Sequence, residues 1–112
     1  MSEVAEPHRA QLLQIEVRYD GTEARILLDG ELDIRTVERF LASIQDALEV
    51  QPGSVAVDAS RVVFLDSSGL AAFLHARSAT DAAGVRFRIS EASPKVRHIA
   101  EVAGVTELLL DD

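Results

Sequence analysis

The sequence has no cysteine, no tryptophan, one tyrosine and four phenylalanines. Without cysteine there is no disulfide and no thiol chemistry, and with so few aromatic rings the core must be aliphatic. No apolar run approaches the ~20 residues that a membrane-spanning helix needs. Residues 1–11 lack the apolar segment of a signal peptide. We therefore expect a cytoplasmic protein.

Basic residues are also scarce, because 11 Lys and Arg face 19 Asp and Glu, which gives a formal net charge of −8. Nucleic acids and anionic membranes need a basic surface, so neither is expected as a partner. Acidity serves solubility and also suits a protein partner with a basic face. The 112 residues, 47% of them apolar, are enough for one domain with one core.

Alternating apolar and polar residues predict strands over 13–19 and 85–89, and the apolar residues 26–28 predict another strand over 24–32. Asp20-Gly21 is typical of a hairpin turn, so the first two strands should pair antiparallel. A short strand over 55–57 should deliver Asp58 to its carboxyl end.

Apolar residues at helical spacing over 37–48 predict an amphipathic helix that a Pro-Gly pair ends. A second helix should run to about Ala83, and Ser93-Pro94 is typical of the start of a third. Residues 105–110 should form a last short strand or a strand plus a turn.

The resulting order is β-β-α-β-α-β-α-β, an α/β fold. It predicts a mostly parallel sheet with an N-terminal antiparallel hairpin and helices packed mainly on one face. We expect a flexible tail over residues 1–11 and a single domain over 12–112. In such sheets, sites lie at the carboxyl ends of the strands.

The central stretch begins with a largely apolar segment over 61–65 that leads into a polar turn, Asp66-Ser67-Ser68-Gly69. Apolar residues at helical spacing follow the turn. Asp and Ser are residue types that start helices, because their oxygens accept unpaired N–H groups of the first turn. The serine hydroxyls should lie at the helix N-terminus, which favours a negative group.

Three motifs at matching spacing give the chain a family resemblance: GELD at 30–33, DSSGL at 66–70, and SPKV at 93–96 followed by a Gly-Val pair. Over about residues 13–110 the chain resembles the STAS domain of bacterial anti-sigma factor antagonists. The resemblance implies that the unphosphorylated domain binds an anti-sigma factor that is also a serine kinase. Phosphorylation would end the binding, and a separate serine phosphatase would restore it.

The resemblance places the phosphorylation at Ser68, supported by Asp66. Asp66 caps the helix, orients the Ser68 hydroxyl, or does both. Ser67 is expected to be structural, as an N-cap or a partly buried hydroxyl. Gly69 permits close approach of a partner or close helix packing.

Small residues beside Ser68 suggest a flat docking surface, although tight packing on the sheet would explain them equally well. The loop that contains Asp33 can reach the same end of the sheet. The expected partner-binding residues are Asp33, Asp66, Ser68, Ala71, Ala72 and His75.

No cofactor, metal or catalytic residue is expected. His75 lies about 10 Å up the helix from Ser68, too far to act as a general base. No G-x-S-x-G motif of a hydrolase is present. Asp58 and Asp66 could hold a divalent cation as in phospho-receiver sites, but no lysine partners them. Two alternatives stay open: a STAS subunit of another assembly, such as a stressosome or a lipid-transport ATPase, and a nucleotide-binding module. A monomer or weak dimer is expected.

Overall fold

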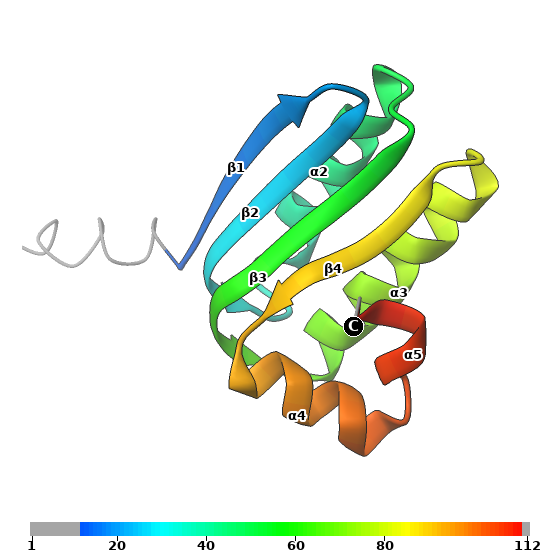
Figure 1. Ribbon diagram of the computed structural model, residues 1–112. Coiled ribbons are helices and arrows are strands. Elements are labelled where there is room, and N and C mark those ends of the chain that lie inside the picture. The colour runs from blue at the N-terminus through cyan, green and yellow to red at the C-terminus, as the bar shows by residue number, and fades with distance from the viewer. Residues whose placement is uncertain (1–11, 111–112) are drawn as a thin grey trace, which may run out of the picture.

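The computed structural model describes residues 12–110, and the stretch predicted to be a tail lies outside this range. Within it a single sheet has the order β1-β2-β3-β4 (Figure 1). The strands are β1 (Leu13–Asp20), β2 (Glu23–Leu32), β3 (Ser54–Leu65) and β4 (Arg86–Ala92). β1 pairs antiparallel with β2, and the remaining pairs are parallel. The predicted hairpin and mostly parallel sheet are confirmed.

Two crossover helices cover one face of the sheet, as predicted (Figure 1). α2 (Val37–Glu49) connects β2 to β3, and α3 (Ser67–Ala82) connects β3 to β4. Phe40 of α2 and Phe73 of α3 are fully buried, and their rings meet edge to face at 5.5 Å between centroids. The rest of the core is aliphatic, as the scarcity of aromatic residues predicts.

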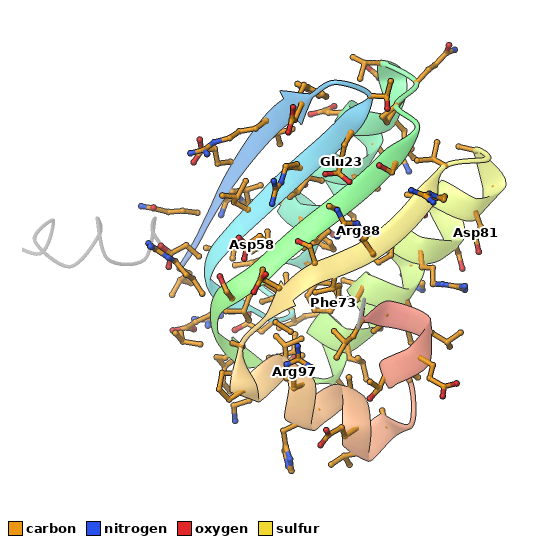
Figure 2. The ribbon with its side chains drawn as sticks, viewed as in Figure 1. Glu23, Asp58, Phe73, Asp81, Arg88 and Arg97 are labelled. Atoms are coloured by element: carbon orange, nitrogen blue, oxygen red, sulfur yellow. The ribbon has the colours of Figure 1, made fainter. Side chains whose placement is uncertain are left out.

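The opposite face of the sheet carries polar side chains. Figure 2 shows Glu23, Asp58 and Arg88 on this face. Arg88 Nη2 donates to Glu23 Oε2 at 3.0 Å, which lowers the pKa of that carboxyl group. The alternation of buried and exposed residues along β1 and β2 separates a packed face from a polar face, whereas the first four residues of β3 are all buried.

The third strand differs from the prediction. β3 runs without interruption from Ser54 to Leu65, so Asp58 lies in its middle and not at its carboxyl end. Register shifts beside Asp58 and between Gly30 and Glu31 absorb extra residues, which is how a bulge lets a strand continue past an irregular stretch.

The C-terminal part contains α4 (Pro94–Ala103) and the four-residue α5 (Thr106–Leu109). The stretch predicted as a strand or strand plus turn forms that helical turn, and its only sheet pairing in the described chain is a bridge between Ile89 and Leu110. The turn places Leu109 in the core, where it is 2% exposed. Across residues 12–110 no helix is long and apolar enough to cross a membrane.

Candidate functional site

The parallel strands bring the three motifs to one end of the sheet. β2, β3 and β4 run in the same direction, so the turns after Leu32, Leu65 and Ala92 lie at their common carboxyl edge (Figure 1). Leu32 and Leu65 are also direct register partners. The prediction for the Asp66–Ser68 turn is therefore confirmed, while Asp58 is separated from it by most of β3.

Asp66 starts α3. Its backbone is extended (φ −113°, ψ −170°), and its Oδ1 accepts the Gly69 N–H at 3.0 Å. The predicted capping role of Asp66 is thus confirmed. Ser67 was expected to be an N-cap or a partly buried hydroxyl, which is wrong: it is the first helical residue and is exposed, because Asp66 already occupies the cap.

Ser68 lies in the first turn of α3 with its side chain half-buried. Ala71 and His75 follow on the same side of the helix and are exposed. Ala72 is only 2% exposed, so its predicted place on a docking surface is wrong. It shares the core-facing side of α3 with Phe73 and Ala76, where a small side chain lets the helix pack closely.

Gly69 is where the helix start meets the exit of β2. A Cβ atom at this position would lie 2.3 Å from the Leu32 carbonyl oxygen and 2.4 Å from Leu65 Cδ1. Of the two interpretations offered by the sequence, close packing is therefore the one that the structure supports. This contact fixes the loop after β2 against the turn that carries Ser68.

That loop is organised by a nearly buried carboxylate. Asp33 is 4% exposed, and its Oδ1 accepts the Arg35 N–H at 2.9 Å. The Arg35 guanidinium donates to both carboxylate oxygens, at 3.1 Å from Nε to Oδ1 and 2.5 Å from Nη2 to Oδ2. It also pairs with Glu31. These bonds lower the pKa of Asp33 and raise that of Arg35.

Asp33 is consequently not the surface contact that the sequence suggested, because its oxygens are used within the loop. The exposed element is Arg35, whose side chain remains 51% accessible. Thr36 completes the turn: its Oγ1 accepts the Asp33 N–H at 3.1 Å and donates to the Glu31 carbonyl at 2.8 Å.

Three exposed apolar residues at this end of the sheet were missed from the sequence. Ile34 is 71% exposed, Val63 is 68% exposed and Phe64 is 42% exposed. Phe64 is the register partner of Glu31, and Ile34 is two residues beyond the carbonyl that contacts Gly69. Ile34 lies between two charged residues in a turn, and this pattern could have indicated that its side chain is exposed. Phe64 reads as one more residue of an apolar strand.

Asp58 and Asp66, the two carboxylates at the predicted strand ends, do not come together. Asp58 Oδ1 accepts the Ser60 N–H and Oγ–H at 3.0 and 2.6 Å. It lies roughly 20 Å from Asp66 along the strand. Residues 12–110 contain no group of three or more His, Cys, Asp or Glu side chains arranged to hold a metal ion.

Comparison with protein families identifies this architecture. The family described as Mlab, STAS domain, matches residues 15–111. The chain belongs to the STAS domain family. This confirms the family that the three motifs predicted. No protein of curated function matches the sequence.

Among solved structures, the chain is similar to the anti-sigma factor antagonist SpoIIAA. The unphosphorylated form is 28% identical with a TM-score of 0.72, over 89% of this chain and 87% of that one. The phosphorylated Bacillus form is 27% identical with a TM-score of 0.67, over 89% and 90%. An anti-sigma factor antagonist from Mycobacterium paratuberculosis shares the fold, with 20% identity and a TM-score of 0.77 over 87% and 82%.

Proposed function

We propose that this STAS domain is a cytoplasmic anti-sigma factor antagonist controlled by phosphorylation of Ser68. The unphosphorylated form binds an anti-sigma factor that is also a serine kinase, and so releases the sigma factor. Phosphorylation of Ser68 ends the binding, and a serine phosphatase restores it. The observation that carries the proposal is the position of Ser68, which is half-buried in the first turn of α3, two residues after the Asp66 cap.

The surroundings of Ser68 suit a protein partner. Ala71 and His75 continue its side of α3 with small or polar exposed groups. Apolar residues are exposed at the same end of the sheet, among them Ile34 after β2 and Phe64 near the end of β3. Large apolar groups that stay exposed beside a polar centre are typical of interaction surfaces.

The physics of the switch follows from charge. A phosphoryl group adds about −1.5 to −2 charges. The helix N-terminus compensates part of this charge, but Asp66 lies two residues away and Arg35 is already paired with Asp33 and Glu31. An unpaired charge enclosed in an interface costs several kcal/mol. About 4 kcal/mol weakens binding a thousandfold.

A second candidate is a STAS subunit of another assembly, in which Ser68 has no switching role. It is favoured by the description of the matching family, which names Mlab and not an anti-sigma factor antagonist. The two candidates differ in which protein is captured and in whether a charge at position 68 matters.

The test uses immobilised wild-type, Ser68→Glu and Ser68→Ala proteins to capture partners from extract of the source cells. Ser78→Glu is the matched control, because Ser78 is exposed on the same helix about 15 Å further along. We expect the wild type and Ser78→Glu to retain an ATP-binding kinase and Ser68→Glu to lose it.

The captured kinase should then transfer one phosphoryl group to the wild type and none to Ser68→Ala, as read by intact mass. If Ser68→Glu retains the same partner as the wild type, Ser68 is not the switch. Capture of a transporter subunit or a large scaffold supports the second candidate instead.

A further inference from the structure

β1 leaves one edge of the sheet unpaired within residues 12–110 (Figure 1). Two hydrogen bonds show how its backbone is oriented. The Leu12 carbonyl accepts from the Glu31 N–H of β2 at 2.7 Å, whereas the Leu13 carbonyl accepts from Arg39 Nη1 of α2 at 2.7 Å. Since backbone groups alternate in direction along an antiparallel strand, even-numbered residues bond to β2. The N–H and C=O groups of Ile15, Val17 and Tyr19 point outward.

The length of edge available for pairing is defined at both ends. Arg39 occupies the Leu13 carbonyl, and the hairpin turn follows Asp20. This leaves residues 14–20, whose midpoint is Val17. A second copy that pairs antiparallel about a two-fold axis at Val17 would use the whole segment.

Charge favours the same register. With the axis at Val17, Glu16 of each chain stands directly opposite Arg18 of the other on the polar face of the sheet. The neighbouring registers that keep the outward groups paired put the axis at Glu16 or at Arg18, so like charges would face each other. Glu16 and Arg18 already form an ion pair with 2.6 Å between Oε2 and Nε, and both are well exposed.

The helix-side face of the edge offers apolar contacts. Tyr19 is 54% exposed, and Ile15 and Val17 are half-buried. In the register centred on Val17, Tyr19 of one chain lies opposite Ile15 of the other. Aromatic side chains opposite β-branched ones are favourable cross-strand pairs. The edge segment therefore matches itself on both faces.

We propose that a second copy of this chain docks on β1, joining two sheets into one through antiparallel pairing of residues 14–20 about Val17. The edge pair of Glu16 and Arg18 is neutral, although each chain carries −8 overall, and repulsion between the distant charges is screened at physiological salt. β2 lies between β1 and β3, the strand that leads into the Ser68 turn, so this turn stays accessible in such a dimer.

The first experiment measures self-association by sedimentation equilibrium. The wild type should form a reversible dimer at high micromolar concentration. Glu16→Arg or Arg18→Glu alone should raise the dissociation constant about tenfold, or about 1.4 kcal/mol. The double exchange restores the opposite-charge pairs and should restore the dimer. A wild type that stays monomeric at about 1 mM overturns the proposal, because its dimerisation free energy would then be weaker than about −4 kcal/mol.

The second experiment reads the register with a short thiol cross-linker, which the absence of cysteine makes clean. Val17→Cys should cross-link to itself, because only the residue on the axis faces its own copy. Asp20→Cys is the control, with its partner thiol roughly 20 Å away. A dimer that is insensitive to the charge variants, or that cross-links equally at both positions, uses another surface and overturns the proposal.

Discussion

Gly69→Ala tests whether the GELD motif at the end of β2 packs closely against the DSSGL motif at the start of α3. The added Cβ would lie 2.3 Å from the Leu32 carbonyl oxygen, where ordinary contact begins at 3.4 Å. The oxygen belongs to the backbone and cannot rotate away. To restore ordinary contact, the end of β2 would have to move by about 1 Å, the difference between these two distances. The loop that contains Asp33 would move with it.

Two effects of opposite sign set the size of the change. Alanine is favoured over glycine in a helix by up to about 1 kcal/mol. Overpacking a well-filled site costs about 1–3 kcal/mol. The clash involves both the Leu32 carbonyl and the Leu65 side chain, so we expect the cost to exceed the gain and the variant to lose about 1–2 kcal/mol of unfolding free energy.

The measurement is urea denaturation, supported by thermal unfolding, in which this loss lowers Tm by roughly 5–15 °C for a domain of this size. Ser67→Ala is the control, since Ser67 is exposed in the same turn and should change stability by less than about 0.5 kcal/mol. If Gly69→Ala is as stable as the wild type or more stable, helix propensity dominates and the packing argument is refuted.

Further predictions concern the same end of the sheet. Asp33→Asn should lose about 1–3 kcal/mol at neutral pH, because Arg35 loses its charged acceptor. The pKa of Asp33 is lowered in the folded state, so this stabilisation is present above the unfolded pKa of about 3.9. It is lost as pH falls through the folded value, and denaturation curves of the two proteins should converge in acid. Asp66→Ala should cost about 1 kcal/mol by removing the cap to Gly69, and Asp66→Asn much less; urea midpoints that fall equally for both would contradict this. Ile34→Asp should leave the urea midpoint nearly unchanged, because its side chain is 71% exposed, yet weaken binding of the captured partner at least tenfold by calorimetry; unchanged affinity would remove Ile34 from the docking surface.

Periodicity was sufficient for most of the fold. The alternation over 13–19 and the Asp20-Gly21 turn predicted the hairpin, and the stripe over 37–48 predicted α2 close to its observed bounds. These signals are local, since they depend on neighbouring residues and on one buried face. The cap of α3 was also local, because Asp66 precedes Gly69, whose N–H donates to it, by only three residues.

The errors arose where long-range pairing decides the structure. Asp58 reads as the end of a strand, but the bulges in β3 depend on its register with β2 and β4, which a single segment does not contain. Ala72 reads as part of a small-residue surface, yet the direction of α3 relative to the sheet places it inside. The C-terminal helical turn likewise forms because it buries Leu109.

The enclosed position of Asp33 predicts that this motif residue affects partner binding through the loop that it organises. Its carboxylate is enclosed and holds Arg35, while Gly69 lets the same loop approach the start of α3. Both residues therefore set the position of exposed groups beside Ser68. On this view only the serine and the exposed side chains around it meet the partner. Substitutions at Asp33 or Gly69 should then lower stability and binding together, whereas a charge at Ser68 should change binding alone.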